Sequence, residues 1–514
     1  MKAFFLQNNK VGYFSQSKDN FTHYQGLCLF EDFELYKYVD NIDSYPKKNL
    51  FSFKKSNELI YEKKGEITID LDVRKIHDFD DKGRIYDFNL QNNALQITYT
   101  KYEDDQLKKI SYKKTFNIKN VSSFNQIGWI KKNYSYDFER KTQSTFWVLR
   151  IKIVANQPIF TFNMSSQKVS LGRSYKDKLF FQLKNLTYKN QILAGLPWFY
   201  QIWARDELIA ITPYILRKEK QIVKNILLRQ LERFENGLLK NRYPESVLGS
   251  IDAAGWFYFR LNQSKDFFTK KELSDIYPRL HKNIKLLIKN RMSEGLILNH
   301  PKETWMDTGK GYDERKGFRV EIQALFLTSL KCLNEIAKSI EEKPPFEELE
   351  IETKEKVKQV LFTDVLNDGF DAGLDTTTRP NVFIAHYVYP QLLSDYEWKI
   401  TFKKVLNECW LDWGGLSSIS NKSDLFQPVH TGINNKSYHR GDSWFWINNL
   451  AAISLKKLGF KEWKKIKSAS LYELNNLGWK GTCAEISDAQ KLASKGSLCQ
   501  AWSISSLYEL LEQN

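Results

Sequence analysis

Two segments that lie far apart in the chain each place a carboxylate beside aromatic or apolar residues. The first runs from Glu303 to Asp307 (ETWMD), and the second runs from Thr482 to Asp488 (TCAEISD) with Glu485 at its centre. Hydrolysis of a glycosidic bond needs one carboxyl group to protonate the leaving oxygen and another to activate water or attack carbon, both beside the same bond. Asp307 and Glu485 are therefore candidates for a pair of catalytic residues.

The neighbours of the first carboxylate predict its role. Trp305 and Met306 give Asp307 an apolar setting, which raises the pKa of a carboxyl group and keeps it protonated near neutral pH, as a general acid requires. Glu485 stands just before a glycine-containing turn at residues 495–497. Because so much sequence separates the two carboxylates, only a closed fold can bring them together.

A third segment, residues 194–207 (AGLPWFYQIWARDE), has the composition of a sugar subsite. Glycine and proline predict a loop, Trp198 and Trp203 supply flat apolar faces, and Arg205 with Asp206 opens the next helix. Sugars stack C–H faces on aromatic rings, and their neighbouring hydroxyls bind between a cation and a carboxylate. A buried ion pair with a helix cap explains the same residues equally well.

Other polar residues have an ordinary structural explanation as well as a functional one. Asp252 suits a helix cap, although its nearness to Trp256 allows a sugar contact. Glu321 is a first-turn acid that faces a helix dipole. His439, taken alone, is best explained as a core histidine. The histidines show no metal-ligand spacing, so neither a metal nor another cofactor is predicted.

Composition excludes several other classes of protein. The net charge of +16 comes from 77 basic and 61 acidic residues scattered along 514 positions, without the concentrated basic face that nucleic-acid binding needs. Five cysteines without paired spacing indicate neither a disulfide framework nor a zinc site, so the cytoplasm is expected. No signal-peptide core or membrane span is predicted, and the oligomeric state stays open.

The period of the apolar residues changes near residue 170. Before it, segments such as 66–71, 95–99 and 145–151 alternate as strands do, which predicts an antiparallel β-sandwich over residues 1–170. After it, twelve helices are predicted to begin near residues 174, 205, 221, 252, 271, 320, 346, 380, 397, 442, 460 and 497. Six antiparallel pairs can close into an (α/α)6 barrel over residues 171–514, so the chain is predicted to be mainly α. A helical solenoid would have a similar count, but no repeat of fixed period is present.

Several motifs occur in one order along residues 190–510, and this order is more specific than any single motif. They are Gly195–Asp206, Ser250–Ala253 before Trp256, Thr304–Asp307, Val320–Leu325, Arg379–Asn381, Tyr438–Trp446, Ala484–Ile486 and Gln500–Ser503. With them the helical part resembles the amylo-α-1,6-glucosidase domain of glycogen debranching enzymes and, more distantly, the glucoamylases. That resemblance implies the same barrel, Asp307 as general acid and Glu485 as general base of an inverting hydrolysis.

The resemblance also implies the sugar contacts. It places Arg205 and Asp206 on the hydroxyls of the terminal glucose and His439, near Trp444, in the same pocket. Trp305 and Glu321 join the candidate contacts.

The implied activity is a cytoplasmic exo-glycosidase that releases glucose from α-1,6-linked stubs of glycogen or limit dextrin. Inversion predicts carboxyl groups about 6.5–9.5 Å apart. Ala204, Thr308 and Ser487 depart from the family's usual residues, and the alternatives are an α-1,4-specific glucoamylase-like enzyme or a silent glucan-binding protein.

Overall fold

The computed structural model divides the chain into two compact units, Met1–Ser170 and Leu171–Asn514. The residues that the structure describes are 10–14, 27–31, 34–39, 51–54, 58–61, 65–71, 82–135, 143–157, 174–188, 190–196, 199, 202–243, 249–307, 314–431, 434–478 and 482–513. Within them, no helix combines the length and apolar character that crossing a membrane requires.

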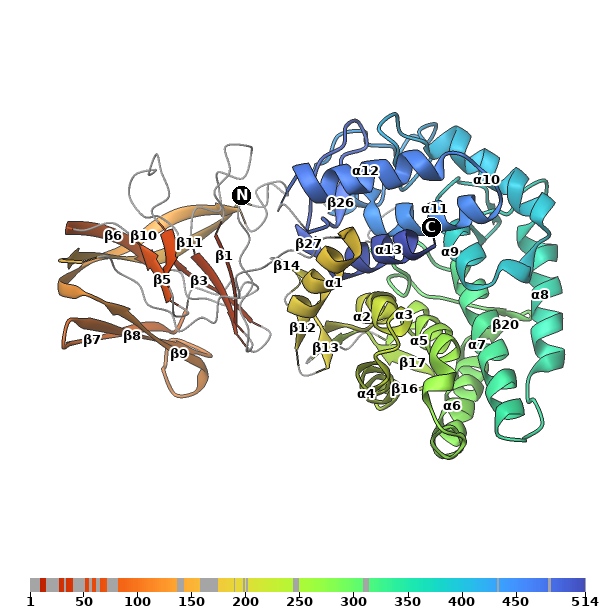
Figure 1. Cartoon of the computed structure of the whole chain (residues 1–514), viewed down its shortest axis with the longest axis horizontal. Coiled ribbons are helices and arrows are strands. Elements are labelled where there is room, and N and C mark those ends of the chain that lie inside the picture. Colours follow the sequence, from red (N-terminus) through yellow and green to blue (C-terminus); the bar gives the residue numbers. More distant parts are fainter. Residues whose placement is uncertain are drawn as a thin grey trace. The chain divides into compact units, whose positions relative to one another are not determined.

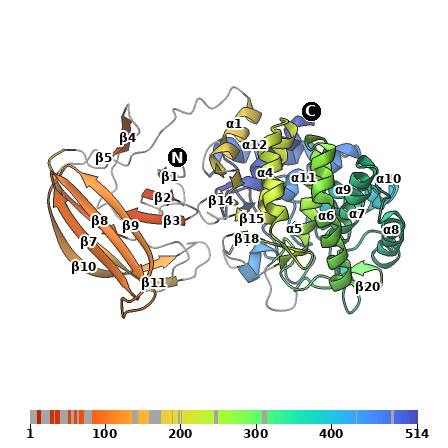
Figure 2. The same cartoon turned by 90° about the horizontal axis from the view of Figure 1, so that it is seen from below.

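The first unit is built of strands joined in antiparallel ladders (Figures 1 and 2). Its described strands are β1 (Lys10–Phe14), β2 (Leu27–Glu31), β3 (Glu34–Val39), β4 (Phe51–Lys54), β5 (Glu58–Tyr61), β6 (Gly65–Leu71), β7 (Arg84–Gln91), β8 (Ala94–Tyr102), β9 (Ile110–Lys119), β10 (Val121–Ser135) and β11 (Gln143–Ala155). The three strand segments named from the sequence lie within β6, β8 and β11.

Aromatic contacts at partly exposed positions join two of these sheets. The sheet β7-β8-β9 meets the sheet β10-β11-β6 through rings of Tyr86 and Trp129, whose centroids are 5.8 Å apart, and of Phe88 and Phe124, at 5.2 Å. Alternate residues of β8 are buried, as the period of two for a strand requires. The N-terminal unit is thus β-rich, as predicted.

The second unit is helical. Its described α-helices are α1 (Tyr175–Leu186), α2 (Ala204–Ala210), α3 (Thr212–Leu216), α4 (Lys220–Leu231), α5 (Ile251–Ser264), α6 (Lys270–Arg291), α7 (Val320–Ser339), α8 (Glu347–Leu361), α9 (Asn381–Val388), α10 (Asp395–Cys409), α11 (Phe445–Lys457), α12 (Trp463–Asn476) and α13 (Ala501–Glu512). Each of the twelve predicted helices has a counterpart here, and α3 is the addition.

The addition of α3 has a local cause. The helix predicted from residue 205 breaks after Ala210 because Pro213 has no amide hydrogen to continue the ladder. The Thr212 hydroxyl donates a hydrogen bond to the Ile209 carbonyl oxygen at 2.9 Å across the break.

Six helices pack in sequence around a closed ring. Helix α2 contacts α5, α5 contacts α7, α7 contacts α9, α9 contacts α11, α11 contacts α13, and α13 contacts α2 again. The remaining long helices pack outside them (Figure 1). The sequence explains this division: α7 and α13 are buried almost all round, whereas α6 buries only one stripe, formed by Leu273, Leu280, Ile284 and Leu287.

Short strands position the ends of the ring helices. The described two- and three-residue strands of this unit are β12 (Thr187–Tyr188), β13 (Gln191–Ile192), β14 (Gly195–Leu196), β15 (Ile202–Trp203), β16 (Phe234–Glu235), β17 (Leu238–Lys240), β18 (Arg242–Tyr243), β19 (Gly249–Ser250), β20 (Met292–Ser293), β21 (Leu296–Ile297), β22 (Phe318–Arg319), β23 (Gly369–Phe370), β24 (Leu374–Asp375), β25 (Ser443–Trp444), β26 (Ile486–Ser487) and β27 (Cys499–Gln500). Strands β15, β19, β22, β25 and β27 directly precede α2, α5, α7, α11 and α13. The N-terminal ends of these helices are therefore fixed by backbone pairing.

Candidate active site

Asp307 lies in the loop after β21 and faces the side chains of Arg205 and His439. Its Oδ2 accepts a hydrogen bond from Arg205 Nη2 at 2.9 Å, and its Oδ1 lies 3.9 Å from His439 Nε2. Burial by itself raises the pKa of this carboxyl group, but contact with His439 and the charge of Arg205 outweigh it and lower the pKa. The sequence-based prediction of a raised pKa for Asp307 was therefore wrong.

Arg205 is the hub of this cluster. It stands in the first turn of α2, is buried, and also donates from Nη1 to Asp252 Oδ2 and to the Thr304 carbonyl oxygen, each at 3.0 Å. Asp252 is the second residue of α5 and also accepts a hydrogen bond from Ser250 Oγ. The carboxylate of Asp252 thus anchors Arg205. Ser250, and not Asp252, caps the helix.

Asp206 is a buried carboxyl group between charged neighbours. Gln500 Nε2 donates to its Oδ1 at 3.1 Å, and Arg205 Nε lies 4.0 Å from its Oδ2. Burial raises the pKa of Asp206 to about 7, because the nearby Arg205 charge is countered by the negative charges of Glu485 and Asp307. Asp206 is therefore within electrostatic reach of both candidate catalytic carboxylates.

Glu485 is held in the loop between α12 and α13. Its Oε2 accepts the Ser497 amide at 2.9 Å, its Oε1 accepts the Tyr438 hydroxyl, and its side chain is buried. Gly496 has φ +63°, and a Cβ there would lie 2.3 Å from Glu485 Oε2. Only glycine permits this approach of the turn to the carboxylate.

Two consecutive residues connect the candidate catalytic carboxylates. Tyr438 donates its hydroxyl to Glu485, while the ring of His439 faces Asp307. The His439 ring stacks on Trp444 with centroids 4.9 Å apart and planes 4° from parallel. Burial lowers the pKa of His439, which favours the neutral imidazole. The structure therefore brings Asp307 and Glu485 to one site, although the sequence separates them widely.

The ring helices present their N-terminal ends to this site. Arg205 and Asp206 lie in the first turn of α2, Asp252 lies in the first turn of α5, and Gln500 directly precedes α13. The N-terminus of a helix carries partial positive charge and free amide donors. Such an end favours carboxylates and oxygen-rich ligands.

Comparison with known families identifies the chain. The family described as amylo-alpha-1,6-glucosidase matches residues 175–509, which is most of the helical unit. The chain belongs to the amylo-alpha-1,6-glucosidase family. No curated protein matches this family member.

Two solved glycosidases are similar in structure to this amylo-alpha-1,6-glucosidase family member. A bacterial glucoamylase complexed with acarbose has a TM-score of 0.62 at 12% identity, covering 99% of this chain and 86% of that one. The GH63 mannosylglycerate hydrolase from Thermus thermophilus, in complex with Tris and D-glycerate, has a TM-score of 0.51 at 14% identity, with 66% and 100% covered. These likenesses show a shared fold, and family membership makes the chain a glycoside hydrolase.

Buried tryptophans form the wall behind His439 in this family member. The Trp305 ring is nearly perpendicular to the rings of His439, Trp444 and Trp446, with centroids 5.1–5.3 Å apart. Trp305 and Trp444 are 2% exposed and orient His439 by packing. Trp256 is 1% exposed between neighbouring rings. The sugar contacts expected for Trp256, Trp305 and Trp444 are corrected, because all three rings are buried against other rings.

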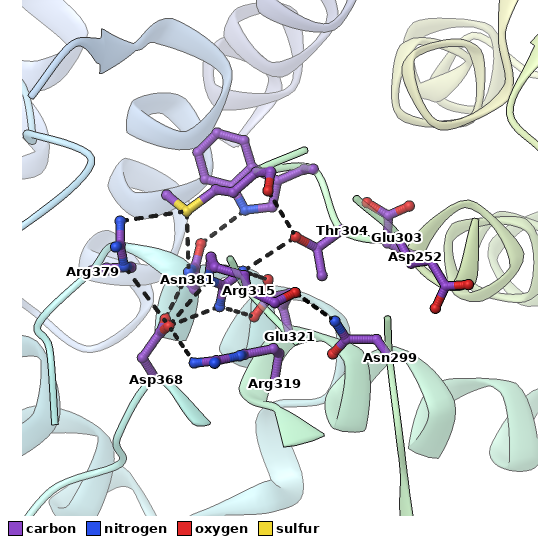
Figure 3. A network of polar contacts seen from close by, with 12 residues as sticks. Asp252, Asn299, Glu303, Thr304, Arg315, Arg319, Glu321, Asp368, Arg379 and Asn381 are labelled. Carbon is purple, nitrogen blue, oxygen red and sulfur yellow. Dashed lines mark hydrogen bonds and ion pairs between the residues drawn. The ribbon is translucent and has the colours of Figure 1, made fainter. Parts of the chain in front are cut away.

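Glu321 belongs to a buried ion network that also contacts Thr304 (Figure 3), a residue of the segment that carries Asp307. Arg315 donates to both carboxylate oxygens of Glu321 and, at 2.9 Å, to Asp368 Oδ2. The predicted substrate contact of Glu321 is therefore corrected, since both oxygens are occupied by Arg315. Arg315 therefore ties Glu321 of α7 to the loop that carries Asp368.

The same network fixes the loop of the candidate acid. Asn381 accepts the Trp305 indole N–H at 2.8 Å and donates to Asp368 at 2.7 Å, and Arg379 donates to the His439 carbonyl oxygen at 3.1 Å. A cavity of about 410 Å³ borders the network, and its lining includes neither candidate catalytic residue. The network therefore holds Trp305 and the His439 backbone in place without including either candidate catalytic carboxylate.

The structure describes one of the two tryptophans that precede Arg205. Trp198 lies outside the described residues. Trp203 is half-buried, pairs with Arg242 through the backbone of β15 and β18, and lies at the N-terminus of α2. Its ring centroid is 6.0 Å from the Arg242 guanidinium carbon. Trp203 thus borders the first turn of α2, where Arg205 stands.

A buried carboxyl group supports the loop of the candidate base. Glu473 of α12 accepts hydrogen bonds from the Ala484 amide at 3.2 Å and from Ser494 Oγ at 2.6 Å. Burial raises the pKa of Glu473 to about 8. Glu473 thus connects both sides of the loop around Glu485.

Three groups that hold the site have no role predicted from the sequence: Tyr438, Gln500 and Glu473. The first two lie in recognised motifs, which were the available signal, whereas Glu473 sits in an ordinary amphipathic helix. Among the described residues, no group of three or more His, Cys, Asp or Glu side chains could hold a metal ion.

Proposed function

We propose that this protein is an inverting exo-glycosidase that releases glucose from α-1,6-linked branch stubs of glycogen or limit dextrin. The observation that carries the proposal is the pair Tyr438–His439, whose side chains reach Glu485 and Asp307 from adjacent positions. Membership of the amylo-alpha-1,6-glucosidase family supports the substrate class. We infer that the closed ring and its outer helices form an (α/α)6 barrel with the site at the N-terminal ends of the ring helices.

In the proposed reaction, Asp307 gives its proton to the oxygen of the glycosidic bond as that bond breaks. Glu485 takes a proton from a water molecule on the opposite face of the sugar, and the resulting hydroxide oxygen bonds to the anomeric carbon. Such a reaction inverts the anomeric centre and needs the two carboxyl groups about 6.5–9.5 Å apart. Arg205 and Asp206 would bind the sugar hydroxyls.

The low pKa of Asp307 in the free protein has to change before this residue can act as an acid. Sugar hydroxyls that accept hydrogen bonds from Arg205 would weaken its pairing with Asp307, and the bound sugar would exclude water from the carboxyl group. Both changes raise the pKa of a carboxyl group. We infer that Asp307 gains its proton on substrate binding.

The pH dependence of catalysis tests this step. The falling limb of kcat/KM at high pH reports the free enzyme, and that of kcat reports the substrate complex. Because an acid catalyst fails as the pH rises through its pKa, we expect the falling limb of kcat to lie at least about one pH unit above that of kcat/KM. Limbs that coincide would mean that substrate leaves the Asp307 pKa unchanged.

A second candidate is an α-1,4-specific glucosidase, which the likeness to a bacterial glucoamylase favours. Initial rates on isomaltose-type and maltose-type oligosaccharides, with the anomer of the released glucose followed by NMR, separate the two. We expect β-glucose, and faster release from α-1,6 links. Faster α-1,4 cleavage would select the second candidate, and α-glucose as the first product would exclude inversion.

A catalytically silent glucan-binding protein is the third possibility, and glucan binding without any release of glucose would identify it.

We place the activity in the cytoplasm, since the four described cysteines, Cys332, Cys409, Cys483 and Cys499, are free thiols.

A further inference from the structure

The first unit contains a hollow of about 350 Å³, a volume typical of small-molecule sites. It lies between the start of β7, the β8–β9 connection and strands β10 and β11. Its lining is Gly83, Arg84, Ile85, Asp105, Leu107, Trp129 and Trp147. None of the residues named in the reaction proposed above belongs to this unit, so the hollow needs an explanation of its own.

Two tryptophans form one side of the hollow. The register of β10 and β11 pairs Trp129 with Leu149 and Lys131 with Trp147, so both indoles project from the same face of the ladder. Trp129 is 41% exposed and Trp147 is 44% exposed. Large aromatic rings normally bury their surface, and two neighbouring exposed indoles beside a hollow indicate a binding surface.

Arg84 holds the two tryptophans in place. Its guanidinium carbon lies 5.0 Å from the ring centroid of Trp129, and its Nη1 donates to the Trp147 carbonyl oxygen at 2.6 Å. The side chain of Arg84 is buried, so it connects both strands as part of the fold. A guanidinium on an aromatic face fixes the ring and leaves its exposed surface free for a ligand.

The lining also includes a polar turn with one strained residue. Asp105 Oδ1 accepts the Gly83 amide at 2.8 Å, and the Asp105 side chain is exposed. Leu107 has φ +56° and is 43% exposed, a costly position for a large apolar residue. The hollow therefore offers aromatic and apolar surface, one cation and one carboxylate.

We propose that this hollow binds a neutral gluco-oligosaccharide and is a glucan-holding site separate from the active site. Opposite charges of Arg84 and Asp105 balance, which suits an uncharged ligand, and the exposed indoles match the C–H faces of pyranose rings. The identity of the sugar as a glucan rests on the proposed function. The site would keep a branched polymer near the enzyme and raise its local concentration.

The test uses the full chain carrying Glu485→Gln, so that bound sugar is not hydrolysed. Maltoheptaose is titrated by calorimetry into this protein with and without Trp147→Ala. We expect a second class of site whose affinity falls roughly tenfold or more with Trp147→Ala. Ile127→Ala is the matched control, because Ile127 is 51% exposed on the same strand as Trp129 and does not line the hollow.

A second variant guards against loss of folding. Trp129→Ala removes a ring that Arg84 covers, whereas Trp147→Ala keeps the backbone oxygen to which Arg84 donates. Thermal unfolding of the two variants is therefore compared, to show which of them keeps the fold. Unchanged maltoheptaose binding in a folded Trp147→Ala protein would overturn the proposal. The proposed function fails by a different result, a wild-type protein that releases no glucose from any glucan, because the binding measurement needs no turnover.

Discussion

Replacing Glu485 with glutamine, or Asp307 with asparagine, is expected to lower the rate of glucose release by about 10²–10⁴-fold. Glutamine keeps the shape and can still engage Tyr438 and the Ser497 amide, but it cannot take a proton from water. Asparagine can still accept from Arg205, but it cannot protonate the leaving oxygen. Steady-state release of glucose, measured beside thermal unfolding, checks both changes.

The matched control for this pair is Asp371→Asn. Asp371 is half-exposed and its partner Lys316 is 3.7 Å away on the surface, so its loss should leave activity within about twofold. A Glu485→Gln or Asp307→Asn protein that is folded and nearly as active as the wild type would refute the catalytic assignment.

Replacing Arg205 with glutamine is expected to remove activity and to lower the free energy of unfolding by roughly 3–5 kcal/mol near neutral pH. The change leaves Asp252 and Asp206 buried without their cation. Burial already raises the pKa of both carboxyl groups against the charge of Arg205, so without Arg205 they bind protons more readily. The loss of stability should therefore be smaller at pH 5 than at pH 8.

Denaturant unfolding at the two pH values measures this difference. Arg279→Gln is the control, because Arg279 forms an exposed pair with Glu232 and its loss should cost less than about 1 kcal/mol at either pH. An Arg205→Gln protein as stable as the wild type at pH 8 would show that Arg205 does not compensate the buried carboxylates.

The helices could be predicted from the sequence because each depends on apolar residues three and four positions apart. The predicted start at 320 agrees with α7, whereas the starts predicted at 442 and 497 are early. The residues just before α11 and α13 are held in β25 and β27, whose partners β26 and β14 lie elsewhere in the chain. Pairing over such distances leaves no local pattern.

The candidate site divides in the same way. Asp307, Glu485 and Arg205 were recognisable by residue type and motif, but the direction of the Asp307 pKa depends on Arg205 and His439, which only the fold brings near. Glu321 was misassigned for a related reason: Arg315, its partner, carries no signal of pairing in the sequence.

The closure of the ring by α13 has a consequence for synthesis of the protein. Strand β27 pairs with β14, Gln500 binds Asp206, and α13 packs against α1 and α2. The last elements of the helical unit therefore close the ring against the first ones. A ribosome makes β27 and α13 after every other helix of this unit. Nascent chains would thus have an open ring of helices and an Asp206 without its Gln500 partner until α13 has left the ribosomal exit tunnel.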